Sequence, residues 1–245
     1  MSDREWPQAR YRFIKQGDTF CARHWCGKAC CVRRCAKAPG ASVHFVYAHI
    51  EKTGGSSIEC ATQRWHDRGW WDNMGHSKLN DIRSCESRCR GVPMKRVVSI
   101  RNPYTYWPSV YKYAWLARDS AVAQWFANRR YSVHKMRQGP LKSFGTFMKW
   151  ARQHTYYTLT ERLNRSCGDP CSYDALLRIE TLAEDWRRLI KVHHLPKIAL
   201  PQFNTATSNR TAPAPPATLT GDVVQIINQL EGRVFAQFNY TRMVV

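Results

Sequence analysis

The sequence of 245 residues predicts an α/β fold in which a central parallel sheet is flanked by helices. Three short apolar runs have the length and the β-branched or aromatic content of buried strands. They are residues 43–48, 96–100 and 175–179. A stretch with apolar residues at helical spacing follows each run, and this alternation is typical of a parallel sheet. We therefore expect ligands to bind beyond the carboxyl ends of these strands.

Apolar residues at helical spacing indicate where the helices lie. The first helix follows the first strand, over residues 58–65. Pro103 stands at the start of another helix, where its missing N–H costs no hydrogen bond. Thr181 and Glu184 fit a capping box at the start of a later helix. The further helices expected are 78–89, 103–115, 119–129, 141–153, 182–190 and 223–230, with loops at 66–75 and 195–219.

Residues 1–40 differ in composition from the rest of the chain. They are basic, rich in cysteine and without a clear apolar period. We interpret them as an N-terminal extension and residues 41–245 as one domain, which is within the usual range of domain sizes. Hydrophobic residues make up 43% of the chain and aromatic residues 12%, which excludes disorder over its whole length.

The net charge points to an anionic partner. Lysine and arginine number 38 and aspartate and glutamate 18, so the formal charge is +20. Nucleic acid, an acidic polysaccharide, an anionic membrane and a polyphosphorylated cofactor all fit this charge, as does an enzyme surface that is simply basic. No apolar run approaches the roughly 18–20 residues of a membrane span, so we expect none in this chain.

The ten cysteines leave three interpretations open. Their even number suits disulfides in a secreted or lumenal protein, but free thiols or a metal site are alternatives. Cys85 and Cys89 share their spacing with Cys167 and Cys171, which would place each pair on one helical face or close a small disulfide loop.

Glycosylation and targeting signals bear on the compartment. Asn164, Asn209 and Asn239 begin Asn-x-Ser/Thr sequons, which matter only in the secretory pathway. The first six residues hold no apolar signal core, so we expect either a cytosolic chain or one from which a targeting segment has been removed.

The first group of residues suited to chemistry is Lys52-Thr53-Gly54-Gly55-Ser56-Ser57, between a strand and a helix. Two glycines let several backbone N–H groups point inward, and the following helix adds its positive end. The lysine and the two serines add a cation and hydroxyl donors. The segment is not a Walker A loop, because the lysine precedes the glycines. The alternatives are a P-loop-like phosphate cradle and an ordinary Gly-Gly turn.

The second group consists of Arg101, at the end of a strand, and Ser109, eight residues later. A turn and a helix between them would bring a guanidinium and a hydroxyl to one phosphate, and arginine suits bidentate phosphate recognition. The alternative is a surface arginine and an unrelated helix serine.

Taken in this order, the two groups resemble motifs of the sulfotransferases that use 3′-phosphoadenosine-5′-phosphosulfate (PAPS). Residues 49–57, HIEKTGGSS, resemble the 5′-phosphosulfate loop H-I-P-K-T-G-G-T-S. Residues 98–104, VSIRNPY, with 109–111, SVY, resemble the 3′-phosphate motif V-x-R-[DN]-P-Y followed by S-x-Y. Residues 167–185 are similar to the C-x-P-C…Y-D…E-T/N-L…D stretch of Golgi carbohydrate sulfotransferases. The likeness covers about residues 43–240.

The chain departs from the family pattern at three places. Glu51 replaces a proline, and Ser56 replaces a threonine but keeps its hydroxyl. Residues 106–108, Tyr-Trp-Pro, replace basic or polar residues, which would alter the start of the helix or the contact with adenosine.

The resemblance implies a sulfotransferase fold, PAPS as cofactor, no metal, and transfer of a sulfuryl group to an acceptor hydroxyl, that of a carbohydrate by family. By the same resemblance, Lys52 neutralises the leaving 5′-phosphate, Arg101 and Ser109 bind the 3′-phosphate, and a late loop with Asn204 and Arg210 closes over the cofactor. The residues implied to hold the 5′-phosphate are Thr53, Gly54, Gly55, Ser56 and Ser57.

A general base is needed for the acceptor proton, and His76 is our candidate. It lies between the two motifs before an expected helix, and the pKa of an imidazole is near operating pH. Glu59 is the alternative base, and an ordinary capping role for His76 also stays open. The tryptophans suited either to ring stacking or to the core are Trp70, Trp71, Trp107 and Trp115.

Two other classes of function compete with this interpretation. A basic nucleic-acid-binding protein would fit the charge, but no reader motif is present. A nucleotide kinase would need a magnesium-binding carboxylate after a strand, where Arg101 stands instead. The acceptor and the oligomeric state are open, and the family favours the Golgi lumen.

Overall fold

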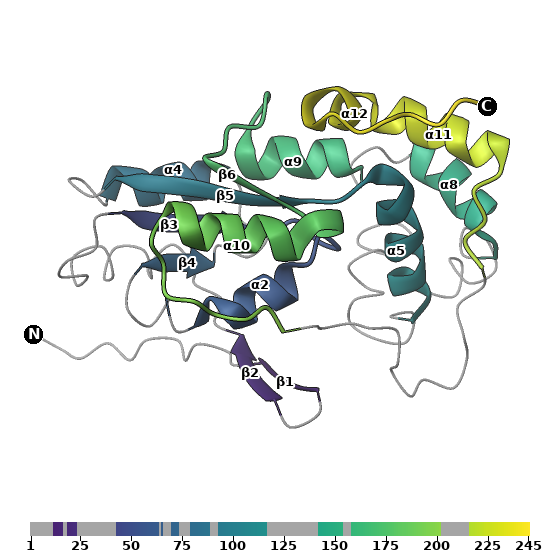
Figure 1. The fold of residues 1–245 in the computed structure, drawn as a ribbon. Helices are drawn as coiled ribbons and strands as arrows, with labels where there is room; N and C mark the ends of the chain where they lie inside the picture. Colours follow the sequence, from purple (N-terminus) through teal and green to yellow (C-terminus); the bar gives the residue numbers. More distant parts are fainter. Residues whose placement is uncertain are drawn as a thin grey trace, which may run out of the picture. The chain divides into compact units, whose positions relative to one another are not determined.

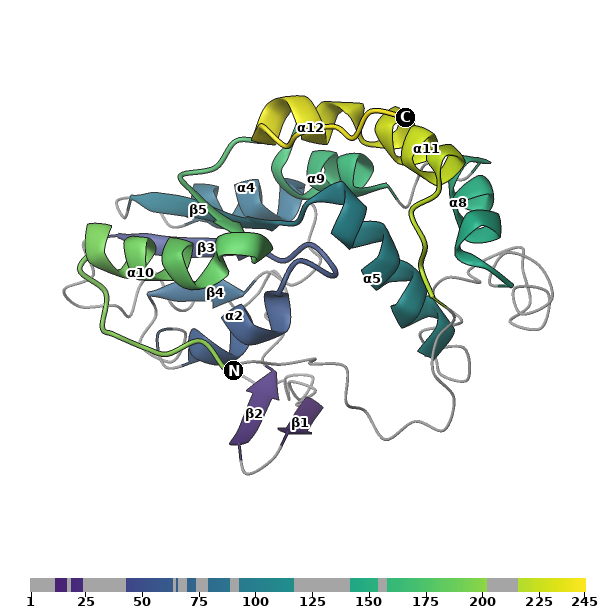
Figure 2. The ribbon, with the colours of Figure 1, turned by 45° about the vertical axis from the view of Figure 1, so that its right-hand side comes forward.

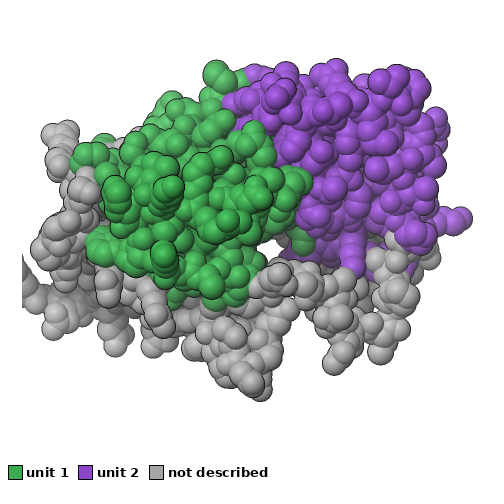
Figure 3. Space-filling view, in the orientation of Figure 1, with its two compact units in different colours: residues 1–100, 165–203 green, residues 101–164, 204–245 purple. Residues whose placement is uncertain are grey.

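The computed structural model describes residues 12–16, 19–23, 43–63, 65, 70–73, 79–88, 93–116, 142–153, 158–201 and 216–245. The chain divides into two compact units (Figure 3). The first comprises residues 1–100 and 165–203, and the second comprises residues 101–164 and 204–245. The predicted domain of 41–245 therefore includes parts of both units, and its boundary near residue 41 stays a prediction.

The first unit is built on a four-stranded, all-parallel sheet in the order β4-β3-β5-β6 (Figure 1). The strands are β3 (His44–Ala48), β4 (Trp71–Asn73), β5 (Met94–Ile100) and β6 (Ala175–Arg178). The predicted α/β fold with a parallel sheet flanked by helices is thereby confirmed, as are the three predicted strands. The chain passes from β3 to β4 on one side and then crosses to β5 on the other. The carboxyl ends of β3 and β5 therefore form a topological switch point, where α/β sheets bind ligands.

Strand β4 lies where a loop was expected, so the prediction for residues 66–75 is wrong at this point. The two polar residues of β4 are fully buried because each has a partner. Asp72 Oδ2 lies 3.0 Å from His44 Nε2 on β3. Asn73 Oδ1 accepts a hydrogen bond from Trp71 Nε1 at 2.7 Å. These contacts let a strand without an apolar run occupy the sheet edge.

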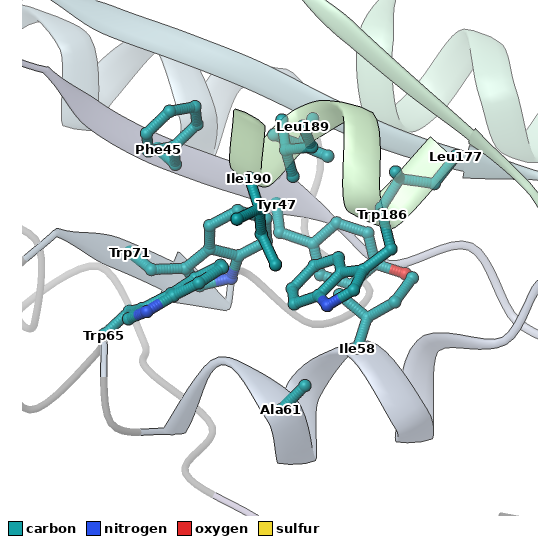
Figure 4. Close-up of a cluster of buried hydrophobic side chains, with 11 residues drawn as sticks. Phe45, Tyr47, Ile58, Ala61, Trp65, Trp71, Leu177, Trp186, Leu189 and Ile190 are labelled. Atoms are coloured by element: carbon teal, nitrogen blue, oxygen red, sulfur yellow. The ribbon is translucent and has the colours of Figure 1, made fainter. Parts of the chain in front are cut away.

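Helices α2 (Gly55–Ala61) and α10 (Leu182–Val192) contribute to one buried cluster with the sheet (Figure 4). Trp65 after α2 stacks on Trp186 of α10, with ring centroids 5.1 Å apart. Trp71 of β4 lies 5.7 Å from Trp65, between Phe45 and the other rings. In Figure 2, α10 runs along the sheet. This core fixes the strand ends that carry the site.

The start of α10 differs from the prediction. A capping box of Thr181 and Glu184 was expected, but no side chain caps this helix. Instead, the Thr181 hydroxyl donates to Asp185 Oδ2 at 2.9 Å, and the same oxygen accepts the Arg178 N–H at 2.8 Å. A short 3-10 turn, η2 (Ile179–Thr181), precedes α10. Asp185 thus joins β6 to α10.

The remaining elements of the first unit include α4 (Leu79–Arg88), which confirms the predicted helix at 78–89. A hairpin of β1 (Arg12–Gln16) and β2 (Thr19–Arg23) lies within the predicted extension and was not expected. Cys167 and Cys171 are paired at disulfide distance, with Cα atoms 4.8 Å apart, which agrees with the disulfide alternative for this pair.

The second unit contains α5 (Pro103–Leu116), α8 (Phe144–Gln153), α11 (Gly221–Leu230) and α12 (Gly232–Phe238). The helices predicted at 103–115, 141–153 and 223–230 are confirmed. The helix predicted at 119–129 lies outside the described residues. Helix α12 and α9 (Leu159–Cys167) were not predicted. Among the helices that are described, none has both the length and the apolar character needed to cross a bilayer.

Glu231 is fully buried between α11 and α12 and organises the second unit. Its carboxylate accepts hydrogen bonds from Trp107 Nε1 at 3.0 Å, from the Leu159 N–H at 2.8 Å and from the Thr160 N–H at 2.9 Å. Burial raises the pKa of Glu231, although these hydrogen bonds oppose the shift. The carboxylate satisfies two N–H groups at the start of α9, which otherwise lack helical partners.

Two buried tyrosines predict a loss of stability at alkaline pH. Burial raises the pKa of Tyr47 and of Tyr106 well above the ordinary value, and Glu231 adds to the shift of Tyr106. The unfolded chain ionises these phenols near pH ~10, whereas the folded chain keeps them neutral. The free energy of unfolding should therefore be unaffected by these groups below that pH and fall as the pH rises above it. Urea unfolding followed by fluorescence at about pH 9 and about pH 11 tests this, and equal midpoints would contradict it.

Candidate functional site

The loop between β3 and α2 carries most of the first predicted group. Two of its residues have left-handed backbone conformations, Lys52 with φ 67° and Gly54 with φ 83°. For the lysine this costs about 1–2 kcal/mol, because its Cβ crowds the following carbonyl. Left-handed residues that alternate with others turn successive N–H groups toward one concave side, which suits an anion.

Neither glycine of this loop has room for a side chain. A Cβ on Gly54 would lie 2.6 Å from Cδ1 of Ile179 and 3.3 Å from Cδ2 of Leu182. A Cβ on Gly55 would lie 1.9 Å from Nε2 of His49. The segment 167–185, which resembles the carbohydrate sulfotransferases, therefore contributes apolar side chains that pack against the loop of Lys52 to Ser57. Close packing requires both glycines.

Four polar side chains of this segment are only partly buried. They belong to Glu51, Lys52, Ser56 and Ser57. The Ser57 N–H donates to the Gly54 carbonyl at 3.0 Å, which begins α2. Helix α2 has only seven residues, so the polar groups that this loop presents are its amides, the lysine and the hydroxyls rather than the end of a long helix.

The loop is tied to β5 by buried hydroxyls. Thr53 Oγ1 lies 2.6 Å from Ser99 Oγ and donates to the Ile50 carbonyl at 2.6 Å. Tyr47 OH lies 2.6 Å from the same Ser99 oxygen. All three side chains are fully buried. The Thr53 hydroxyl therefore faces the interior and supports the loop, and its place among the residues that hold the cofactor stays a prediction.

His49 and Glu59 form a buried pair under the loop. His49 Nδ1 lies 2.7 Å from Glu59 Oε1, and both residues are less than one-tenth exposed. The imidazole thus lies between the Glu59 carboxylate and the backbone of Gly55. This arrangement favours a structural role for Glu59 over the alternative of a general base.

Arg101 and Ser109 are brought to one face of α5 in the second unit. Arg101 Nε donates to Thr105 Oγ1 at 3.0 Å. Thr105 and Ser109 are four residues apart on the helix, so their side chains are neighbours on the same face. Lys112, three residues further and exposed, continues this stripe. The guanidinium, the hydroxyls and a second cation therefore share one side of α5.

The residues between Arg101 and Ser109 have structural roles. Asn102 Oδ1 accepts the Tyr104 N–H at 2.9 Å, which caps α5 ahead of its first-turn proline. Tyr106 and Trp107 are fully buried. The helix continues through Pro108, so the departure from the family pattern does not break α5. These aromatic residues supply core contacts to the second unit.

The other residues singled out in the sequence are the tryptophans, the candidate base and the residues of the late loop. Trp71 and Trp107 are fully buried in the two cores, so ring stacking on a ligand is wrong for both. Trp70 and Trp115 are partly buried, and their predicted stacking stays untested. The predicted base and the two residues of the late loop, His76, Asn204 and Arg210, lie outside the described residues.

Sequence reasoning missed Lys112 and the supporting role of His49. The spacing of Thr105, Ser109 and Lys112 gives a polar stripe at helical periodicity, which could have indicated the lysine. No pattern in the sequence indicates that His49 lies against Gly55, because this contact depends on how the loop folds back.

Comparison with known proteins gives no match to a family model, to a curated protein or to a solved structure.

Proposed function

We propose that this chain is a PAPS-dependent sulfotransferase that transfers a sulfuryl group to an acceptor hydroxyl, by resemblance that of a carbohydrate. The observation that supports it most is the loop of Lys52 to Ser57. It combines two left-handed residues, two glycines without room for a side chain and partly exposed polar donors at a topological switch point. Such a loop suits a phosphate group, and the motif order suits PAPS. The finer assignment of the sheet to the sulfotransferase fold belongs to this proposal.

PAPS would supply the sulfuryl group and a phosphate leaving group. Lys52 would place a positive charge where negative charge develops on the leaving phosphate, which is the main kind of stabilisation in group transfer of this type. The N–H groups of the loop and the hydroxyls of Ser56 and Ser57 would orient the 5′ end of the nucleotide. Buried hydrogen bonds hold the loop in place, so little ordering would be left for the binding step.

The 3′-phosphate is assigned to Arg101 and Ser109 by the sequence motif. A guanidinium binds phosphate through two parallel hydrogen bonds, so a nucleotide with a 3′-phosphate would bind more tightly than one without it. Lys112 on the same stripe of α5 would add a second cation. Asn204 and Arg210 stay assigned to the late loop by resemblance alone.

His76 stays the proposed general base. An imidazole with its usual pKa accepts a proton near neutral pH and releases it again after transfer. Glu59 is less suited because it is buried against His49. A lumenal setting of the Golgi type also belongs to the proposal, and the disulfide between Cys167 and Cys171 supports an oxidising compartment.

Thermal unfolding in the presence of candidate ligands tests the proposal. Adenosine 3′,5′-bisphosphate, the nucleotide product, should stabilise the folded chain by about 2.7 kcal/mol at a hundredfold excess over its dissociation constant. ATP with magnesium and duplex DNA should give much smaller shifts. Stabilisation by ATP with magnesium alone would favour a kinase, and stabilisation by DNA alone would favour a nucleic-acid-binding protein; either result overturns the proposal.

A further inference from the structure

We propose that Tyr47, Ser99 and Thr53 form a one-way hydrogen-bond chain that positions the backbone of the phosphate loop. The inference rests on the proposed function for its ligand, but its geometry lies entirely within the first unit. The three side chains act through the loop, so they are positioning residues and not catalytic ones.

Counting protons fixes the direction of the chain. Each hydroxyl has one hydrogen to donate. The Thr53 hydroxyl donates its hydrogen to the Ile50 carbonyl at 2.6 Å, so it must accept a hydrogen bond from the Ser99 hydroxyl. Ser99 has then used its hydrogen and must accept from Tyr47 OH. The order is therefore Tyr47 to Ser99 to Thr53 to the carbonyl of Ile50, and no other assignment satisfies all three contacts.

The end of the chain matters for an anion site. A carbonyl oxygen carries partial negative charge and repels a phosphate if it faces one. The Ile50 carbonyl accepts from the Thr53 hydroxyl at 2.6 Å and from the Thr53 N–H at 3.4 Å, so it is held inside the turn. The next residues can then turn their N–H groups to the other side. The same bonds offset the cost of the left-handed conformation of Lys52.

Burial makes each hydroxyl of this hydrogen-bond chain difficult to replace. Tyr47, Ser99 and Thr53 are fully buried, so water cannot replace a lost hydroxyl without rearrangement. The phenol is neutral at pH 7 even with the ordinary pKa of tyrosine, and burial raises the pKa of Tyr47 further. Tyr47 lies on β3 and Ser99 on β5. The hydrogen-bond chain therefore fixes the position of the loop relative to the two strands that form the switch point.

Two variants of Thr53 separate positioning from folding. Thr53→Val has nearly the same shape but lacks the hydroxyl, whereas Thr53→Ser keeps the hydroxyl. Each is titrated with adenosine 3′,5′-bisphosphate and with adenosine 3′-phosphate, which lacks the 5′-phosphate that the loop would bind. We expect Thr53→Val to weaken the bisphosphate about tenfold and the 3′-phosphate less than about twofold. Thr53→Ser should bind both within about twofold of wild type.

A second measurement does not depend on the nucleotide. Amide hydrogen exchange at residues 51–55 should be faster in Thr53→Val than in Thr53→Ser, with β3 equally protected in both. Wild-type protein that fails to bind the bisphosphate would end the proposed function, and the exchange result would still decide the positioning role. Unchanged loop exchange, or an equal loss of affinity for both nucleotides, would overturn the inference.

Discussion

Replacing Lys52 with alanine is expected to lower the rate of sulfuryl transfer from PAPS by about 10²–10³-fold while leaving the fold intact. The lysine side chain is partly exposed in the loop, so its removal creates no cavity in the core. Its ammonium group is the cation of the loop that would stabilise charge on the leaving phosphate. Transfer of labelled sulfate to an acceptor array measures the rate, and circular dichroism checks the fold.

The control for this variant is Lys149→Ala, which removes the same charge from the exposed side of α8. We expect it to keep nearly all activity, so a general effect of net charge is separated from the local effect. Activity within about threefold of wild type in Lys52→Ala would contradict the role assigned to this lysine.

Gly55→Ala is expected to destabilise the first unit by about 3 kcal/mol or more, and to abolish binding of the nucleotide product. The new Cβ would lie 1.9 Å from His49 Nε2, and the ring cannot move away freely because Glu59 holds it from the other side at 2.7 Å. Either the imidazole loses its partner or the loop backbone shifts. Urea unfolding measures the first effect, and titration with adenosine 3′,5′-bisphosphate measures the second.

Gly145→Ala on α8 is the matched control. Its Cβ would meet only Val223, at 4.0 Å, so alanine should be tolerated and add up to about 1 kcal/mol of helix stability. The double variant Gly55→Ala with His49→Ala removes the clashing ring. Its free energy of unfolding should exceed the value expected from adding the two single effects. Additive losses would show that the contact between His49 and Gly55 is not the cause.

The sequence predicts those helices and strands whose buried residues form a local apolar pattern. Strand β3 is buried along its whole length, so it reads as an unbroken apolar run. Strand β4 has no such signal, because Asp72 and Asn73 are buried through partners on other elements. The same is true of α9, whose start is satisfied by the distant Glu231.

The candidate site also has parts that the sequence predicts and parts that it does not. The sequence predicts the loop of Lys52 to Ser57, since its glycines and lysine follow a strand. It does not predict that Thr53 faces inward, because a hydroxyl is equally suited to a ligand and to Ser99. The sequence also does not show which tryptophans are available to stack on a ligand. Trp71 and Trp107 are as compatible with stacking on adenine as with the core, and only the packing around them decides.

The proposed function requires that one nucleotide bind through both of its phosphates, and calorimetric titration tests this requirement directly. Adenosine 3′,5′-bisphosphate, adenosine 3′-phosphate and adenosine 5′-phosphate are each titrated into wild type, Lys52→Ala and Arg101→Ala. We expect the bisphosphate to bind wild type at least about tenfold more tightly than either monophosphate. Lys52→Ala should remove its advantage over the 3′-phosphate, and Arg101→Ala its advantage over the 5′-phosphate. A wild-type chain that binds the bisphosphate no better than the monophosphates would contradict the claim.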